Sequence, residues 1–261
     1  MKQRIIAALI ALPLVLVPIW LGGLWWVALV TLLSIWAGWE LYALLAQGGY
    51  PANRWLGIPW LVLLVYTGWQ PQRLPLAPIL VLGIMATFIH SLYQTEKPLA
   101  HWLSTLGGAL YPGILIAQIT ALRLAPDGLW WLLLGLLITW GNDTLAYLVG
   151  ITLGRHKLWP RLSPKKSWEG TLGGWVTAAL IGGAMLASSP LPGSFGLGLL
   201  VGLGGGVLAL FGDLSVSMIK RQVGVKDSSH LFPGHGGLLD RLDSILFVIP
   251  YISLVMQLLT R

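Results

Sequence analysis

The sequence predicts an all-α integral membrane protein that crosses the bilayer about nine times. Of its 261 residues, 56% are hydrophobic and only 10% are charged, whereas a soluble domain averages about 25% charged residues. The 15 tryptophans fit the same class, because amphipathic indole rings collect at membrane–water interfaces. Backbone groups in hydrocarbon must pair within their own segment, so the spans are expected to be helices.

The individual spans follow from the apolar stretches. A helix needs about 20 apolar residues to cross a bilayer core of roughly 30 Å. The N-terminal "MKQRIIAALIALPLVLVPIW" is similar to a secretory signal, but no small-x-small cleavage site follows, so it is predicted to be retained as the first helix. With charges, prolines and glycines as breaks, the predicted spans lie near residues 5–21, 24–46, 55–69, 76–93, 103–122, 129–149, 170–188, 195–212 and 243–260.

The basic residues indicate how these spans are oriented. With nine crossings, thirteen Lys and Arg residues fall on the side of the N-terminus and three on the other side. Positively charged loops face the cytoplasm, which predicts a cytoplasmic N-terminus and a multi-pass location in the cell inner (plasma) membrane. The cytoplasmic group is Lys2, Arg4, Arg54, Lys97, Arg155, Lys157, Arg161, Lys165, Lys166, Lys220, Arg221, Lys226 and Arg241. The opposite group is Arg73, Arg123 and Arg261.

Two regions are expected, with N-terminal transmembrane helices in 1–128 and the chemistry-bearing region in 129–261. The long loops of the second region, 150–169 and 213–242, fall on the same cytoplasmic face. Small residues recur every four positions in the two spans between these loops, and such stripes let helix backbones approach closely. The stripes are compatible with a homodimer and equally with packing within one chain.

Composition also excludes several classes of site. The chain has no cysteine, which rules out disulfides, zinc–thiolate sites and iron–sulfur clusters. A GxxxxGK[ST] phosphate loop is absent, which argues against a P-loop ATPase. The net charge of +7 is interpreted as attraction of cytoplasmic loops to anionic lipid headgroups, so nucleic acid is not an expected partner.

Acidic residues are concentrated near one stretch of the chain. Residues 213–243 hold eight charged residues and two histidines, while residues 170–212 hold no charge. Asp240 and Asp243 are three positions apart and would share one face of a helix, and Asp213 is expected to close the preceding span. Acids at a helix N-terminus can be simple caps. Three carboxylates near one membrane face nevertheless favour a site for Mg²⁺ or Mn²⁺ rather than zinc.

Basic side chains and glycines are interleaved with these acids. Gly234, Gly236 and Gly237 permit positive φ angles and a close approach of the backbone to a ligand. Cations, carboxylates and glycine amides together are typical of phosphoryl or nucleotidyl transfer. Ser167 is expected to cap the helix that follows it, with Glu169 in the first turn.

The stretch "SMIKRQVGVKDSSHLFPGHGGLLDRLD" at 217–243 closely resembles the signature of the phosphatidate cytidylyltransferases, also called CDP-diacylglycerol synthases. A second family-like block is "NDTLAYLVGITLGRHKLWPRLSPKKSWEG" at 142–170. The N-terminal half is similar only as apolar helices, with Glu40 as a candidate family feature. One departure is "GDLSVS", where Val216 occupies a position at which the family often has Glu. A metal-binding role of that glutamate therefore does not carry over.

The resemblance implies conversion of CTP and phosphatidate (phosphatidic acid) to CDP-diacylglycerol and pyrophosphate, with Mg²⁺, in phospholipid biosynthesis and in contact with membrane lipid. The expected metal ligands are Asp213, Asp240 and Asp243. The residues expected to act in catalysis, mainly by holding phosphates, are Lys220, Arg221, Lys226, Asp227, His235 and Arg241. The expected substrate-binding residues are Asn142, Asp143, Lys165, Lys166, Ser167, Gly234, Gly236 and Gly237. Asn142 and Asp143 would orient the nucleotide or a second cation.

The main alternative is a polytopic membrane transporter of an ion or anionic solute. A transporter predicts ionisable residues spread through the depth of the bilayer and an internal repeat. The sequence instead gathers its acids at one face and shows no obvious repeat. A CDP-alcohol phosphotransferase also uses aspartates at the membrane face, but its longer Asp-Gly…Ala-Arg…Asp…Asp pattern is absent here.

Overall fold

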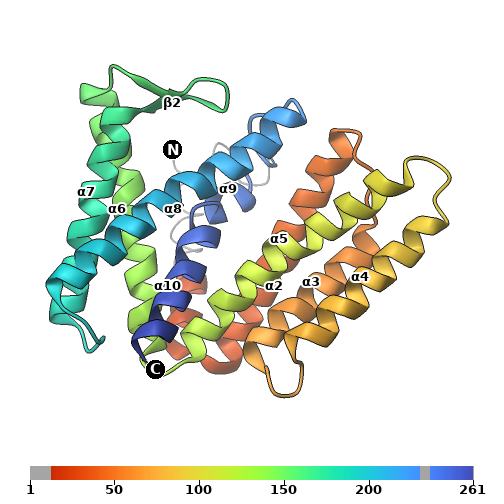
Figure 1. Cartoon of the computed structure of the whole chain (residues 1–261), viewed down its shortest axis with the longest axis horizontal. Coiled ribbons are helices and arrows are strands. Elements are labelled where there is room, and N and C mark those ends of the chain that lie inside the picture. Colours follow the sequence, from red (N-terminus) through yellow and green to blue (C-terminus); the bar gives the residue numbers. More distant parts are fainter. Residues whose placement is uncertain (1–12, 230–235, 261) are drawn as a thin grey trace. The chain divides into compact units, whose positions relative to one another are not determined.

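The computed structural model describes residues 13–229 and 236–260 and is almost entirely helical there (Figure 1). This confirms the all-α prediction, apart from one short hairpin. Residues 13–21 are helical. The helices that follow are α2 (Gly23–Gln47), α3 (Arg54–Trp69), α4 (Leu76–Leu92), α5 (Pro98–Leu124), α6 (Gly128–Leu153), α7 (Trp168–Ser188), α8 (Phe195–Gln222), α9 (Leu239–Leu242) and α10 (Ile245–Leu259). The hairpin consists of β1 (Lys157–Trp159) and β2 (Ser163–Ser167).

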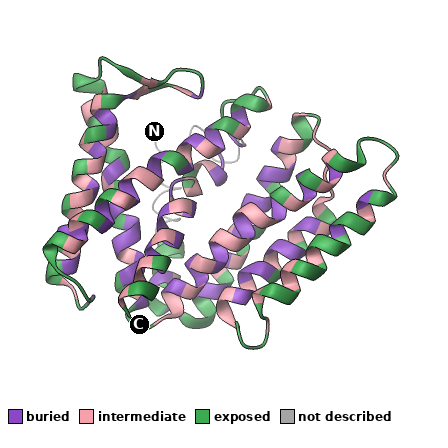
Figure 2. Ribbon diagram, viewed as in Figure 1, coloured by how far each residue is buried: buried purple, intermediate pink, exposed green. Residues whose placement is uncertain are grey.

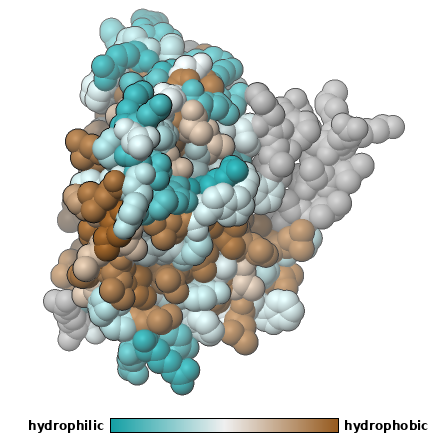
Figure 3. All heavy atoms as spheres, turned by 90° about the vertical axis from the view of Figure 1, so that its right-hand side faces the viewer, coloured by the Kyte–Doolittle hydropathy of each residue, from teal (hydrophilic) through white to brown (hydrophobic). Residues whose placement is uncertain are grey.

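The described helices have the length and surface of a multi-pass membrane protein. Six segments are long and apolar enough to cross a membrane: α2, α5, α6, α7, α8 and the segment that joins α9 to α10. Many large apolar side chains on them remain exposed, among them Leu24, Leu200 and Leu258 at 67–70%. Hydrophobic surface gathers across the middle of the face seen in Figure 3, with hydrophilic side chains at its two ends. A bilayer would cover such a band.

The contacts divide the chain into two compact units. The first contains residues 1–124 together with 223–239, and the second contains residues 125–222 and 240–261. The segment 223–239 therefore belongs with the N-terminal helices, although in the sequence it separates two helices of the second unit.

In the first unit, α3 packs against α2, α4 and α5, and a buried tyrosine joins three of these helices. Tyr42 of α2 donates a hydrogen bond of 2.7 Å to the carbonyl of Thr105 on α5. Its ring fills the space beside Gly57 of α3 and Gly108 of α5, where a Cβ atom would overlap the ring. The two glycines therefore make room for the one large side chain that ties these helices together.

In the second unit, α7 packs against α6 and α8, and α10 packs against α6 and α8. The predicted stripes of small residues lie at the contact of α7 and α8. A Cβ atom at Gly202 would overlap the carbonyl of Ala178, and one at Gly182 would lie 2.8 Å from the Cα of Gly202. The glycines thus allow backbone-to-backbone packing within this unit. Figure 2 shows buried residues on the inward sides of the helices and exposed residues on the outward sides.

The two predicted loops, 150–169 and 213–242, contain secondary structure: a β-hairpin in the first and the end of α8 in the second. The helix expected to end at residue 212 continues to Gln222, so Asp213, Lys220 and Arg221 lie on α8 and not in a loop. The reason is that these charged side chains find partners at the side of the helix, so a charge here does not mark its end. The region 150–169 contains the antiparallel pair β1–β2, in which Lys157 is opposite Ser167. Figure 1 shows this hairpin at the start of α7.

Candidate functional site

A cavity of about 460 Å³ in the second unit gathers most of the residues that the sequence predicted to act together. It lies among α6, the hairpin, α7, α8 and the turn between α9 and α10. Its apolar wall includes Trp175 and Leu210. The predicted site residues that line it are Asn142, Asp143, Lys165, Lys166, Ser167, Asp213, Asp240 and Asp243.

Separate elements bring four carboxylates to this cavity, one of which is Asp240 of α9. Asp143 comes from α6, Asp213 from α8, and Asp243 from the turn that follows α9. The three side chains are close enough to repel one another electrostatically. Gly212 permits this arrangement, because a Cβ atom there would overlap the carbonyl of Asp243.

Asp240 and Asp243 do not share one continuous helix, contrary to the prediction. Asp240 lies on α9, which ends at Leu242, and α10 begins at Ile245. Asp243 accepts a hydrogen bond of 2.6 Å from the backbone N–H of Ser244. This local bond satisfies the backbone where the chain turns between the two helices. Both carboxylates still line the same cavity.

Two lysines neutralise two of the aspartates, in different environments. Lys220 Nζ lies 2.6 Å from Asp240 Oδ1, and these side chains are only 11% and 13% exposed. Lys166 Nζ lies 2.7 Å from Asp213 Oδ2, with 25% and 33% exposure. The first pair fastens α9 to α8, whereas the second joins β2 to α8 at the more open side of the cavity.

Asn142 lines the cavity, but its amide oxygen is buried against neighbouring helices. Its Nδ2 donates to Asp143 Oδ1 at 3.1 Å, while its buried Oδ1 accepts no hydrogen bond. Gly174 and Gly206 leave room for this amide, since a Cβ atom at either would lie 2.8 or 3.2 Å from Oδ1. A buried acceptor without a partner is costly, and the close packing of these two glycines leaves this oxygen enclosed between the helices.

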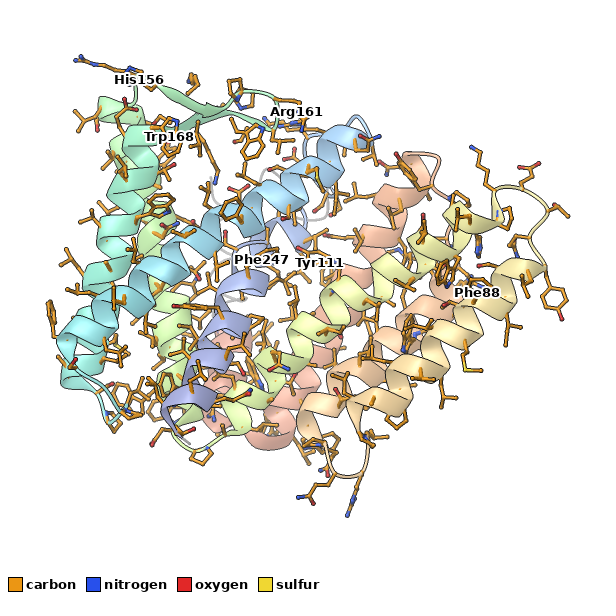
Figure 4. All side chains as sticks on the ribbon, in the orientation of Figure 1. Phe88, Tyr111, His156, Arg161, Trp168 and Phe247 are labelled. Carbon is orange, nitrogen blue, oxygen red and sulfur yellow. The ribbon has the colours of Figure 1, made fainter. Side chains whose placement is uncertain are left out.

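The hairpin is fastened to α7 at its base. Ser167 Oγ accepts from the N–H of Gly170, which confirms the predicted cap. Glu169 does more than occupy the first turn, because it also accepts from the backbone N–H of Arg155 and contacts Nδ1 of His156 at 2.6 Å. Figure 4 shows His156 and Trp168 near this base and Arg161 farther along the hairpin. Lys165 and Lys166 are thereby held at the rim of the cavity.

Other predicted residues are placed differently. Of the basic residues, Lys220, Arg221 and Arg241 do not line the cavity: Lys220 pairs with Asp240, and Arg221 donates through Nε to the carbonyl of Leu162 at 3.3 Å. Val216, at the position where the family often has Glu, is fully buried on α8. Four predicted residues belong to the first unit: Lys226, Asp227, Gly236 and Gly237. Gly234 and His235 lie outside the described residues.

Sequence reasoning gave little weight to Glu40, which the structure shows as a buried hydrogen-bond centre of the first unit. Its carboxylate accepts hydrogen bonds from Ser228, Ser229 and two backbone N–H groups in the signature stretch. An acid in the middle of an apolar helix was the available signal, but its partners lie nearly two hundred residues away and no local pattern identifies them.

The cavity fits a divalent cation that takes part of its coordination from a substrate. Among residues 13–229 and 236–260, no group of three or more His, Asp or Glu side chains is gathered tightly enough to hold a metal ion by itself. Mg²⁺ commonly uses one or two carboxylates, waters and substrate phosphates. The donors present are the carboxylate oxygens of the lining aspartates, and the mutually repelling carboxylates favour added positive charge.

A model of the cytidylyltransferase family matches residues 2–259. The chain is 42% identical over 130 residues to a protein of Staphylococcus haemolyticus, an alignment that covers 50% of each chain. It is 39% identical over 151 residues to a protein of Bacillus subtilis, covering 58% of this chain and 56% of the relative. Both relatives are named phosphatidate cytidylyltransferase. The chain thus spans about half the length of the curated relatives it matches.

The two ion pairs are expected to differ in their effect on stability. Lys220→Met removes the ammonium group that lies 2.6 Å from the buried Asp240 carboxylate, which should lower the free energy of unfolding by about 3–5 kcal/mol. Lys166→Met breaks a more exposed pair and should cost about 1 kcal/mol or less. Denaturant unfolding in detergent measures both variants. Equal losses would contradict the assignment of Lys220–Asp240 as the buried structural pair.

Proposed function

The chain belongs to the cytidylyltransferase family, and we propose that it transfers the cytidylyl group of CTP to phosphatidate, forming CDP-diacylglycerol and pyrophosphate. The observation that carries this proposal is the cavity of the second unit, where aspartates from three elements and two lysines of the hairpin meet. The names of the relatives support the choice of substrates.

The proposed reaction needs charge neutralisation more than a strong base. A phosphate oxygen of phosphatidate attacks the α-phosphorus of CTP. The bond from that phosphorus to the oxygen bridging to the β-phosphate breaks, and pyrophosphate leaves with the electron pair. The nucleophile is already an anion, so the barrier comes from bringing two polyanions together in line, which positioned cationic groups reduce.

The side chains of the cavity suit these tasks. Lys165 and Lys166 would bind substrate phosphates from the hairpin, and Asn142 would help to orient the nucleotide or a second cation through its hydrogen bond to Asp143. Asp213, Asp240 and Asp243 would hold Mg²⁺, with Asp143 near a second cation. When bound, the cation would neutralise charge on the transferring phosphoryl group and the departing pyrophosphate. Lys166 would exchange its contact with Asp213 for a substrate phosphate.

The α6 wall supports entry of a lipid. Tyr147 and Ile151 line the cavity and are 67% and 62% exposed. Both lie on α6, a helix long and apolar enough to cross a membrane. An apolar, exposed wall beside charged groups can accept a molecule with acyl chains on one side and a phosphate on the other. This suits phosphatidate better than a water-soluble acceptor.

For the membrane arrangement we propose nine crossings, with the N-terminus and the cavity at the cytoplasmic face of the inner membrane. Besides the six long apolar segments, residues 13–21, α3 and α4 supply three further helices at predicted spans. The distribution of Lys and Arg supports the orientation. A homodimer remains a prediction from the small-residue stripes.

Purified protein in detergent with labelled CTP, phosphatidate and Mg²⁺ should form labelled lipid, and chelation of the metal should stop the reaction. Asp213→Asn should lower kcat by at least about 100-fold, because it removes charge at the phosphoryl-transfer site. Asp127→Asn is the matched control, since Asp127 is exposed and has φ 52°, a conformation that Asn tolerates. Turnover by the Asp213 variant at the control rate would contradict the proposed site.

The orientation can be tested on the same chain because it has no cysteine, so a single introduced thiol has no background. Arg161→Cys on the hairpin should react with a membrane-impermeant maleimide only after the membrane is permeabilised. Gln72→Cys between α3 and α4 should react in intact cells. Labelling of both thiols from the same side would refute the proposed crossings.

A further inference from the structure

Glu40 is a buried carboxylate in the first unit whose role the proposed chemistry does not explain. It lies on α2 and is only 4% exposed. Its Oε1 accepts from Ser229 Oγ at 2.7 Å and from the N–H of Leu238 at 3.0 Å. Its Oε2 accepts from Ser228 Oγ at 3.1 Å and from the N–H of Leu239 at 2.9 Å. Each oxygen therefore binds one hydroxyl and one backbone amide.

The surrounding backbone is shaped to fit this carboxylate. A Cβ atom at Gly237 would overlap Ser228 Oγ and lie 2.5 Å from Glu40 Oε2. Gly236 has φ 73°, a conformation that glycine adopts without strain. Two adjacent glycines thus let the segment close around Glu40, which gives Gly237 a packing role in addition to the substrate contact expected from sequence.

The bonded segment is the part of the chain that leads into the cavity residues. Ser228 and Ser229 directly follow Lys226 and Asp227 of the signature stretch. Leu239 is the first residue of α9, and the next residue is Asp240. The backbone N–H of Leu239 is therefore fixed by Glu40 one residue before a carboxylate that lines the cavity.

We infer that Glu40 is a positioning residue, which holds the two serines and the backbone of Leu238 and Leu239 in the conformation that presents Asp240 to the cation. The inference rests on the proposed function. An ionisable residue within a transmembrane helix is costly, and an apolar side chain would satisfy packing alone. Four donors converging on one carboxylate from a segment 188–199 residues away indicate that the acid is there to organise that segment.

Glu40→Gln isolates this role because it preserves size. In either orientation the glutamine amide group faces one seryl hydroxyl and one backbone N–H. The hydroxyl can rotate to accept a hydrogen bond, but the backbone N–H cannot. The variant must therefore lose the bond to Leu238 or to Leu239. Ser228→Ala combined with Ser229→Ala removes the hydroxyls and keeps both backbone bonds, so its effect should be smaller.

The experiment compares Glu40→Gln with Glu96→Gln, a change at an exposed glutamate of the same unit. Hydrogen–deuterium exchange of the peptide covering 236–242 should become faster only in Glu40→Gln. The Mg²⁺ concentration for half-maximal activity should rise by about 10- to 100-fold, as for other residues that orient metal ligands. If the variant only reduced the amount of folded protein, the maximal rate would fall and the Mg²⁺ concentration for half-maximal activity would stay the same.

Unchanged exchange, or an unchanged Mg²⁺ requirement in the folded variant, would overturn the inference. If Glu40→Gln does not fold, the Ser228→Ala, Ser229→Ala variant is judged by the same two measurements, with smaller shifts in the same direction supporting the role. A wild-type chain inactive on CTP and phosphatidate would instead overturn the proposed function. Hydrogen–deuterium exchange of the peptide covering 236–242 would then be the measurement that decides whether Glu40 holds the backbone of Leu238 and Leu239.

Discussion

The structure depends on one constraint: a carboxylate in an apolar, membrane-embedded chain must be matched by donors or cations. An unpaired buried charge costs several kcal/mol, and the acids here avoid that cost by joining distant segments. Glu40 binds Leu239 in the first unit, whereas in the second unit Asp213 binds Lys166 of the hairpin and Asp240 binds Lys220 of α8. The contacts that satisfy the charges therefore also fix the fold within each unit.

The two lysine–aspartate pairs differ in how enclosed they are, although both aspartates line the cavity. The Lys220–Asp240 pair is nearly enclosed, so it can hold α9 against α8 throughout a reaction cycle. The Lys166–Asp213 pair is more open and lines the cavity with both members. In the proposed mechanism a cation takes the place of Lys166 beside Asp213, and a substrate phosphate takes the place of Asp213 beside Lys166. The open pair thus keeps the cavity near neutral before two highly charged substrates arrive.

Much of the fold and part of the site could be predicted from the sequence. Apolar stretches predict the helices, the end of one such stretch indicates Asp213, and the signature stretch contains Asp240 and Asp243; all three aspartates line one cavity. The extent of α8 was missed because a charged residue was taken as a helix end, and the hairpin because its short strands lack an apolar alternation. The contacts of Glu40 could not be foreseen, since they depend on how the chain returns to α2 after almost two hundred residues.

The central claim is that the cavity of the second unit holds a divalent cation together with the phosphates of the nucleotide. Crystals grown with Mn²⁺ and CTP test it directly, because manganese is located by its anomalous scattering. We expect an anomalous peak bordered by Asp213, Asp240 and Asp243, with the CTP phosphates beside it and Lys166 turned towards them. Manganese and phosphates bound together elsewhere on the protein, with Asp213 still paired to Lys166, would contradict the account.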